Sequence, residues 1–388
     1  MKLKVSERSS ILQQSEIRNM SLECDKIGGI NLSQGICDLE TPTVVKAGAK
    51  KAIDNGFNHY TRYDGLEELR KAIAKKVLNF NKLKVDPEKN IVVSAGTTGA
   101  LYCALLALLN PKDEIMIFEP YYGYHINTLQ AVGAKPIYIK LNPSKGWSFD
   151  MKELEKKVTN KTKGIMINTP GNPSGKVFSK EELNKITDFC IKHDLFIFTD
   201  EIYEYFIYDG LSYNSPMSIK KAFDRTIAIS GYSKTFSTTG WRVGYVICHE
   251  KWKKTIGYMN DLVYVNAPSP LQIGIAQGIL TLKDDFYLNI KNQYQLKRDK
   301  ICKILTEIGL TPHIPQGAYY ILADVSKVPG KTSKEKAMYI LKKTSVATVP
   351  GSAFYHGKGG ENLVRFCFAK NDTILENACK KLRELKIK

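Results

Sequence analysis

Short apolar runs alternate with longer amphipathic segments through the middle of the chain. The β-branched run at 91–94 predicts a strand, glycines at 96–99 interrupt it, and 100–109 has the composition of a helix. Residues 180–193 show helical periodicity. Such alternation favours an α/β fold with a mostly parallel sheet sandwiched by helices, whose functional loops follow the carboxyl ends of the strands. Further strands are expected at 115–118, 134–139, 164–168, 195–199, 226–230 and 243–248.

The pattern changes after about residue 280. One long helical pattern covers 283–309, and strands are expected at 313–323 and 346–349 with helices between and after them. This predicts a second, smaller α+β domain. The residues before about 42 do not fit the strand–helix alternation and are expected to join it. The predicted division is a large domain at 43–282 and a small domain at 1–42 and 283–388, which suits a chain of 388 residues.

The composition is that of a globular protein, with 43% hydrophobic and 25% charged residues. It excludes a disordered chain, a collagen and a coiled-coil rod. The net charge of +18 raises the question of nucleic acid. Lysines and arginines are spread along the whole chain, however, and no RRM, zinc-finger or homeodomain pattern occurs. We therefore expect no nucleic-acid partner, while a basic surface would still favour anionic substrates.

The eight cysteines are scattered without a C-x-x-C pair, which is typical of free buried thiols in a reducing compartment. The first twenty residues are polar and charged, and no stretch reaches the length of a membrane span. The sequence thus predicts a cytoplasmic protein without a membrane partner. The six histidines lie far apart and no H-E-x-x-H occurs, so no metal site is expected.

A lysine in an unusual setting is the first candidate for chemistry. Lys234 lies in a tight, apolar-flanked loop, Ser-Gly-Tyr-Ser-Lys-Thr-Phe, directly after a predicted strand. Desolvation would lower the pKa of its amine and make it a nucleophile that forms a Schiff base. Arg242 follows eight residues later, with a planar fork suited to phosphate. Taken alone, such a lysine is more often exposed or structural.

Three other strand ends carry polar groups. Asn172 lies in a Pro/Gly turn with two X-Pro bonds that can be cis, and the alternative is an ordinary connecting turn. Asp200 leaves an apolar strand and needs a cation or hydrogen bonds, unless it caps a helix. The strand–turn–helix segment at Gly96, Thr97 and Thr98 would offer backbone N–H groups to an anion.

Together these motifs resemble the class I/II pyridoxal-phosphate (PLP) aminotransferases of fold type I. The resemblance is carried in order by Asn-Pro-x-Gly at 172–175, Asp-x-x-Tyr at 200–203, Ser-Lys followed by Gly-Trp-Arg-x-Gly at 233–244, and Arg365 in Leu-Val-Arg-Phe-Cys-Phe. It covers nearly the whole chain. It implies an amino acid:2-oxo acid aminotransferase with PLP as cofactor, which works by ping-pong transamination.

The resemblance also implies roles for single residues. Lys234 would hold PLP as an internal aldimine and then move the proton between Cα and C4′. Asp200 would keep the pyridine nitrogen protonated, so that the ring acts as an electron sink. Tyr203 and Asn172 would hydrogen-bond the phenolate oxygen of PLP, and Arg242 would clamp the phosphate.

Further positions match the family at the cofactor and the substrate. Gly96, Thr97 and Thr98 would bind the phosphate, and Tyr122 would stack on the ring unless it is only an aromatic strand end. Arg365 would bind the substrate α-carboxylate, helped by Asn172 and the backbone of Gly35. Gly231 replaces a serine common in the family, which leaves Ser230 or Ser233 as the substitute hydroxyl at the phosphate.

The same resemblance implies an assembly. Tyr60, in His-Tyr-Thr-Arg-Tyr-Asp-Gly, is similar to the tyrosine that reaches the phosphate from the neighbouring subunit. The active protein would then be a homodimer with shared active sites.

The amino donor stays open at this point. Some segments look like kynurenine/glutamine and methionine aminotransferases, others like prokaryotic aspartate and broad-range enzymes, with 2-oxoglutarate or a similar acceptor. Arg62 is a candidate cation for a second substrate carboxylate, against a plain surface or interface charge. Tyr63, Tyr121 and Tyr124 would instead line an aromatic or thioether pocket. A PLP-dependent cysteine-conjugate β-lyase on the same fold is the alternative function.

Overall fold

The computed structural model describes residues 3–6, 9–10, 12, 14–385 and 387, so the outermost ends of the predicted small domain lie outside the described residues. A seven-stranded sheet forms the larger part of the molecule. Its strands run parallel except β8, which is antiparallel to both of its neighbours. This confirms the mostly parallel sheet. In spatial order the strands are β2 (Ile91–Ser94), β8 (Gly244–Cys248), β7 (Thr226–Gly231), β6 (Phe196–Asp200), β5 (Thr162–Asn168), β3 (Glu114–Glu119) and β4 (Lys135–Lys140).

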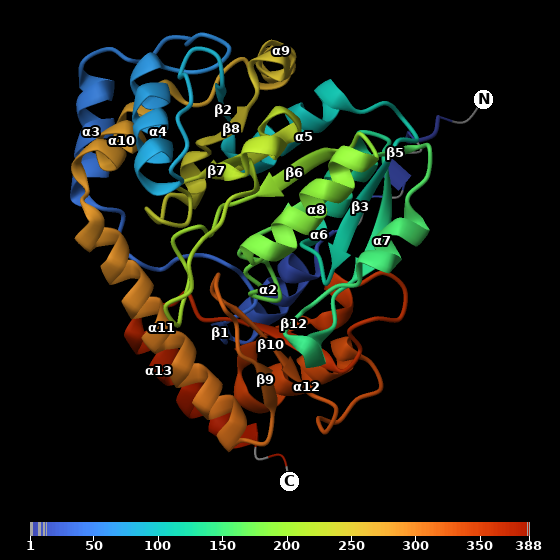
Figure 1. Ribbon diagram of the computed structural model, residues 1–388. Helices are drawn as coiled ribbons and strands as arrows, with labels where there is room; N and C mark the ends of the chain where they lie inside the picture. Colours follow the sequence, from blue (N-terminus) through green and yellow to red (C-terminus); the bar gives the residue numbers. More distant parts are fainter. Residues whose placement is uncertain (1–2, 7–8, 11, 13, 386, 388) are drawn as a thin grey trace.

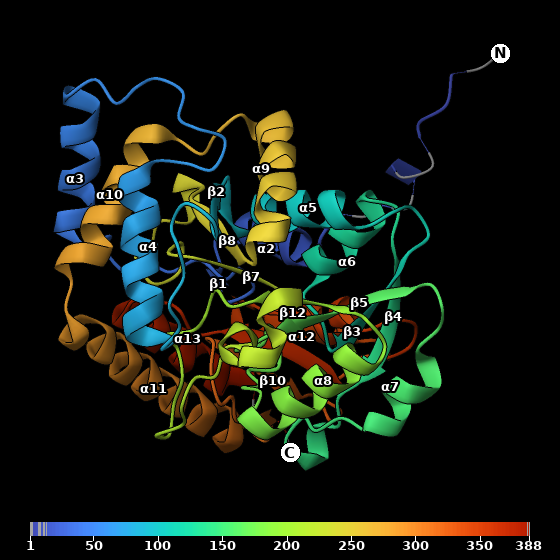
Figure 2. The ribbon, with the colours of Figure 1, turned by 45° about the horizontal axis from the view of Figure 1, so that its top comes forward.

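Helices cover both faces of this sheet (Figure 1; Figure 2). Ile115 and Ile117 of β3 pack in a core with α5 (Gly96–Leu108), α6 (Gly123–Ala131) and α9 (Glu250–Tyr264). The intervening Met116 and Phe118 pack on the opposite side with α7 (Met151–Lys157) and α8 (Lys180–Lys192). Because neighbouring side chains point to opposite faces, a strand buried on both sides is a continuous apolar run. Beyond the β2 edge α3 (Thr43–Asp54), α4 (Glu67–Phe80) and α10 (Ser269–Thr281) pack together.

The C-terminal elements gather at the other end of the molecule, with the N-terminal helix among them (Figure 1). Met20 and Leu32 share one apolar core with Ile304 and Ile340. The residue boundaries of the two domains stay a prediction. The elements here are α2 (Glu16–Lys26), α11 (Asp284–Glu307), α12 (Ser333–Thr344), α13 (Asp372–Leu382), a parallel pair of β1 (Ile30–Asn31) with β11 (Val346–Ala347), and an antiparallel sheet ordered β12 (Val349–Pro350), β13 (Leu363–Cys367), β10 (Tyr320–Asp324), β9 (Thr311–His313). Short 3-10 helices occupy Pro143–Lys145, Pro216–Ser218, Lys220–Arg225, Thr239–Trp241, Gly351–Phe354 and Arg383–Leu385.

Two strand predictions are wrong in detail. The strand expected at 313–323 is two strands, because the backbone between them bonds to the large sheet's loops. Gly317 N–H donates to Gly175 O at 2.9 Å, and Ala318 N–H to Phe206 O at 2.9 Å. The strand expected at 346–349 also divides, because β11 pairs with β1 whereas β12 pairs with β13.

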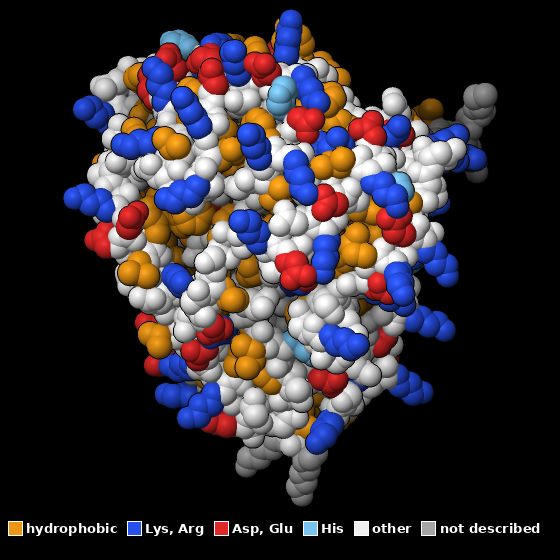
Figure 3. Space-filling model, viewed as in Figure 1, with side chains coloured by type: hydrophobic (Ala, Val, Ile, Leu, Met, Phe, Trp, Pro, Cys, Tyr) orange, Lys and Arg blue, Asp and Glu red, His pale blue; other side chains and the backbone are white. Residues whose placement is uncertain are grey.

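The surface agrees with the spread of charge along the sequence. Figure 3 shows lysine and arginine side chains dispersed over one face, with acidic side chains between them. Within the described part of the chain no helix is long and apolar enough to cross a membrane. The described histidine, cysteine and acidic side chains form no group arranged to hold a metal ion.

Candidate active site

A cavity of about 460 Å³ opens where the carboxyl ends of β5, β6 and β7 meet the small sheet. Side chains from both parts of the molecule and from α2 line it. The carboxyl edge of parallel strands is the usual place for a site in such a fold. The structure brings the following predicted residues to this cavity: Gly35, Thr97, Thr98, Tyr122, Asn172, Asp200, Tyr203, Ser233, Lys234, Arg242 and Arg365.

Lys234 lies in the loop after β7, with its side chain in the cavity. Its Nζ donates to the carbonyl oxygen of Gly35 at 3.1 Å. Burial lowers the pKa of this amine from its ordinary value, because the charged form loses its hydration. No carboxylate among the described residues forms an ion pair with it. The amine is therefore more readily available in its neutral, nucleophilic form than that of an exposed lysine.

Asp200 is held at the end of β6 by two contacts. Its Oδ1 accepts the backbone N–H of Ile202 at 3.2 Å, and His125 Nε2 lies 2.9 Å from its Oδ2. His125 is buried on α6, edge-on to the ring of Tyr122. The sequence analysis missed His125. Its spacing, one helical turn after Tyr122, was a usable signal, since that places both on one face of the helix.

Arg365 is fully buried on β13 and has too few acceptors. Its Nη1 donates to Asn172 Oδ1 at 2.9 Å and its Nη2 to the carbonyl oxygen of Ser33. Its Nε has no hydrogen-bond partner, and none of the described carboxylates pairs with it. The guanidinium lies against the ring of Tyr320, 4.3 Å from the centroid. A buried cation that has only neutral partners and one N–H group without an acceptor is suited to bind an anionic ligand.

A hydrogen bond closes the turn that carries Asn172. Both X-Pro bonds of this segment, Thr169-Pro170 and Asn172-Pro173, are cis. The backbone N–H of Asn172 donates to Asn168 Oδ1 at 2.7 Å, which closes the turn at the end of β5. The Asn172 side chain is thereby fixed against Arg365 at the cavity wall.

A second group of unpartnered hydrogen-bond donors lies at the start of α5. No side chain caps this helix, so its first backbone N–H groups, at Thr97 and Thr98 among others, lack acceptors within the helix. Arg242 packs directly over Gly96, where a Cβ atom would lie 2.2 Å from Arg242 Nη2. The φ of +74° at Gly96 also favours glycine at this position. Arg242 Nη1 donates to Thr239 O at 2.9 Å, and no ion pair to it occurs in the described residues.

The structure separates the two serines proposed for this region. Ser230 Oγ lies on the far side of β7, where it donates to Glu204 Oε1 at 3.1 Å. Ser233 lines the cavity instead. The geometry thus favours Ser233 as the hydroxyl near Arg242.

Tyrosines form the remaining wall of the cavity. The hydroxyls of Tyr203 and Tyr320 lie 2.9 Å apart. Burial raises the pKa of both phenols and of Tyr122, so all three keep their protons at neutral pH. Gly35 permits the approach of Tyr320, since a Cβ at 35 would collide with the Tyr320 hydroxyl at 1.9 Å.

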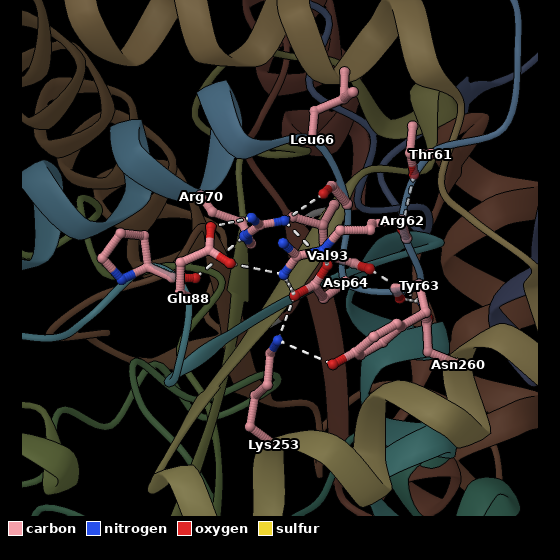
Figure 4. Close-up of polar contacts among 12 residues, drawn as sticks. Thr61, Arg62, Tyr63, Asp64, Leu66, Arg70, Glu88, Val93, Lys253 and Asn260 are labelled. Atoms are coloured by element: carbon pink, nitrogen blue, oxygen red, sulfur yellow. Dashed lines mark hydrogen bonds and ion pairs between the residues drawn. The ribbon is translucent and has the colours of Figure 1, made fainter.

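Two predicted residues lie outside the cavity. Tyr60 is 84% exposed in the loop before α4. Arg62 forms ion pairs with Asp64 and Glu88, at 2.6 and 2.8 Å (Figure 4). Of the tyrosines proposed to line a side-chain pocket, Tyr124 borders the cavity. Tyr63 instead packs against α9, and Tyr121 lies beside Tyr138.

Arg18 is a further cation that the sequence analysis missed. It lies on α2 at the exposed rim of the cavity, next to Ile17. It has no ion pair with any residue that the structure describes. Nothing in the local sequence marks it, because its position depends on how α2 packs across the cavity.

Comparison with known proteins decides the family. The model of the family "Aminotransferase class I and II" matches residues 27–382. The chain belongs to this family. It is 35% identical over 386 residues to aromatic-amino-acid aminotransferase 2 of Thermococcus litoralis, covering 98% of both chains. It is 37% identical over 392 residues to the aspartate aminotransferase of Pyrococcus abyssi, covering 99% of both.

Solved structures agree. The fold matches that of N-succinyldiaminopimelate aminotransferase from Mycobacterium tuberculosis with a TM-score of 0.95, at 30% identity, over 98% of this chain and 100% of the other. The protein is therefore a PLP-dependent aminotransferase of fold type I, which transfers an amino group between an amino acid and a 2-oxo acid. The relatives are transaminases, so the β-lyase alternative is not favoured. The cavity fits PLP, because it holds an unpaired lysine, an anion site and a carboxylate.

Proposed function

We propose that the residues of the cavity divide the work of transamination among them. PLP, when bound, supplies an electron sink for the negative charge that develops at the substrate Cα. Lys234 Nζ would hold the cofactor and, with the substrate bound, would move the proton of the substrate Cα as a general acid and base. The observation that carries this proposal is the position of Lys234, a desolvated amine without a carboxylate partner in a cavity with three other cations that lack ion pairs in the described chain, Arg18, Arg242 and Arg365.

Asp200 and the tyrosines tune the cofactor. Asp200, held by His125, keeps a proton on the pyridine nitrogen by offering it a carboxylate. Tyr203, held by Tyr320, and Asn172 donate hydrogen bonds to the phenolic oxygen. Tyr122 packs on the ring.

The two anion sites hold the two ends of the reacting molecules. Arg242, Ser233 and the start of α5 at Gly96, Thr97 and Thr98 bind the phosphate of the cofactor. Arg365 and Asn172, together with the backbone of Gly35, bind the α-carboxylate of the substrate. Arg365 offers its unpaired Nε for this purpose.

The exposure of Tyr60 supports a homodimer with shared active sites. Tyr60 has no role in its own cavity and is 84% exposed. The nearby end of α9 exposes apolar side chains, with Leu262 at 79% and Tyr258 at 54%, and Tyr258 contacts Tyr63 of the same loop. An exposed apolar patch of this kind marks an interface. A second copy that covers it would receive the Tyr60 hydroxyl at its cofactor phosphate.

The substrates include dicarboxylates. Lys234, Arg242 and Arg365 are committed to the cofactor and the α-carboxylate, and Arg62 is paired with Asp64 and Glu88. Arg18 is unpaired at the cavity rim and is the cation available to a second carboxylate, as in aspartate, glutamate or 2-oxoglutarate. Monocarboxylic donors would use the apolar surface of Tyr124. All eight cysteines are free and buried, which supports a reducing, cytoplasmic setting.

The test is spectroscopic. The PLP-loaded protein is scanned before and after separate additions of glutamate, aspartate, methionine, glutamine and phenylalanine. We expect the spectrum of bound PLP to change to that of pyridoxamine phosphate, with the dicarboxylic donors most effective. Failure to bind added PLP in a lysine-linked form overturns the assignment of Lys234. Release of ammonia and pyruvate from a cysteine conjugate without formation of pyridoxamine phosphate would instead support the lyase.

A further inference from the structure

The loop between α3 and α4 carries the exposed Tyr60 on a fixed base. Directly before Tyr60, Ser269 Oγ donates to His59 O at 2.6 Å. At the end of the loop the backbone N–H of Leu66 donates to Gln272 Oε1 at 2.8 Å. Both anchors belong to α10, so one helix holds the loop on both sides of Tyr60.

A group of charged side chains, here called the Asp64 cluster, fixes the second half of this loop (Figure 4). It consists of Arg62, Asp64, Arg70, Glu88 and Lys253. The Asp64 carboxylate has no exposed surface and binds three cations. Its Oδ1 accepts from Arg62 Nε at 2.8 Å and Arg70 Nη1 at 3.0 Å, and its Oδ2 accepts from Arg62 Nη2 at 2.6 Å and from Lys253 Nζ. Both arginines also reach Glu88.

The backbone beside Asp64 is tied to the strand that leads into the phosphate site. The N–H of Val93 on β2 donates to Asp64 O at 3.0 Å. Asn260 Nδ2 bridges Tyr63 O at 2.9 Å and Val93 O at 3.2 Å. Gly65, at φ +89°, permits this approach, because a Cβ there would lie 2.5 Å from Val93. These contacts therefore act on residues 63–65, shortly after Tyr60.

We propose that Asp64 is a positioning residue, which holds Arg62, Arg70 and Lys253 together and thereby aims the Tyr60 hydroxyl at the cofactor phosphate of the partner subunit. This inference rests on the role proposed for Tyr60. A loop that is ordered before assembly loses little conformational entropy when the subunits meet. The substitution Asp64→Asn keeps the shape but leaves three neighbouring cations with Glu88 as the remaining carboxylate of the cluster, and so releases the loop.

A double-mutant cycle on the intact dimer tests this coupling. The affinities of Y60F, D64N and the double variant are measured for PLP and for pyridoxal, which lacks the phosphate. We expect Y60F and D64N each to weaken PLP binding by about tenfold, the loss of one charge-assisted hydrogen bond, with pyridoxal unaffected. The double variant should bind PLP no more weakly than Y60F, since both changes remove the same contact.

The outcomes separate this inference from the proposed function. Losses that multiply in the double variant, or a loss of D64N that is equal for PLP and pyridoxal, overturn the role of Asp64 alone. A Y60F enzyme with unchanged PLP affinity overturns the role of Tyr60 and, with it, that of Asp64. If D64N does not fold, R62Q takes its place, because Arg62 is half exposed and its removal leaves Asp64 paired with Arg70 and Lys253.

The restoration of activity in mixed dimers gives an independent test. It would not be seen if Asp64 only stabilised its own subunit. A hybrid of D64N and K234A chains has one site that combines an intact Lys234 with an intact loop from the other chain. Random mixing makes about half of the dimers hybrid, and one of the two sites in each hybrid is intact. We therefore expect about a quarter of all sites to have wild-type activity. No rescue above the D64N homodimer overturns the inference. K89Q, which removes a surface ion pair with Glu250 outside the cluster, is the matched control and should behave as wild type.

Discussion

Two buried arginines show how the same side chain is paired with carboxylates in one place and left without them in another. Arg70 and Arg365 have 1% and 0% of their surface exposed. Arg70 contacts the carboxylates of Asp64 and Glu88 and two backbone carbonyl groups. Arg365 contacts an amide and one backbone carbonyl group, and its Nε is idle. Carboxylates neutralise the charge of Arg70 within the fold, whereas no described carboxylate pairs with Arg365.

The difference extends to the surroundings of each arginine. Lys253 and Arg62 join Arg70 around acidic groups in the Asp64 cluster. Lys234 and the exposed Arg242 accompany the buried Arg365 in the cavity without ion pairs inside the described chain. A buried cation without a counter-charge costs several kcal/mol of stability. We expect the removal of an unpaired cation from the cavity to lower the activity. We expect the removal of a buried cation that is paired with carboxylates to lower the free energy of unfolding.

The largest effect should follow the loss of Lys234. In Lys234→Ala we expect turnover to fall at least about 10⁴-fold, because the variant lacks the group that we propose to bond to the cofactor and to move the Cα proton. The melting temperature should not fall, since a desolvated amine is removed. Single-turnover kinetics and a thermal melt check both statements. Lys180→Ala, at the exposed start of α8, is the control. A variant with wild-type turnover contradicts the central assignment.

Removal of Arg70 should act on stability. For Arg70→Met we expect the free energy of unfolding to fall by about 3–5 kcal/mol, because Asp64 and Glu88 lose a buried partner. Urea denaturation measures this. The control is Lys71→Gln, which breaks an exposed pair with Glu67 on the same helix and should leave the free energy of unfolding nearly unchanged. Equal effects of the two variants would remove the distinction between the two kinds of site.

Arg365 should give the opposite result. In Arg365→Met we expect KM to rise about 100-fold for every amino acid, because all substrates share the α-carboxylate. The free energy of unfolding should stay the same or increase. Steady-state kinetics with aspartate and methionine test the first statement. A rise confined to one of them would place Arg365 in a side-chain pocket, and Arg383→Met, from a surface pair with Glu307, is the control.

The sequence predicted this cavity well because its polar groups directly follow apolar strands. Asp200 closes β6 and Lys234 follows β7, so strand recognition alone placed both at one edge of the sheet. Residues brought in by packing could not be placed. Arg62 meets Glu88 from 26 residues away, and Arg18 reaches the rim through the packing of α2. The segment at 313–323 was predicted as one strand because its bonds to Gly175 and Phe206 leave no mark in the local pattern.

A third buried group contains two carboxylates and one lysine, and it should make the stability of the fold depend on pH. Buried Glu201 and Glu204 share Lys76, whose Nζ lies 2.5 Å from Glu204. Burial and the charge of Glu204 raise the pKa of Glu201 to about 8, against hydrogen bonds from Tyr213 and Ser215. The folded state therefore holds a proton that the unfolded state releases above about pH 4.5.

The raised pKa of Glu201 predicts that the free energy of unfolding falls as the pH rises. Stability from protonated Glu201 is complete below the unfolded pKa and is lost as the pH rises to about 8. From pH 6 to pH 7.5 the free energy of unfolding of the wild type should fall by about 2 kcal/mol relative to Glu201→Gln, whose amide keeps the hydrogen bonds. Urea titrations at both values measure it. Parallel curves for the two proteins would show that Glu201 is ionised throughout.

The smallest effect tests whether the unpaired cation at the cavity rim belongs with Arg365. In Arg18→Met we expect kcat/KM for aspartate and glutamate to fall about tenfold, with methionine and phenylalanine unchanged, because only the former carry a second carboxylate. Since Arg18 is exposed, salt should weaken the preference of the wild type and leave the variant unaffected. Lys26→Met, from the exposed pair with Glu23 on the same helix, is the control. If all donors respond alike, Arg18 acts on the placement of α2. Of the two arginines, Arg365 alone would then bind a substrate carboxylate.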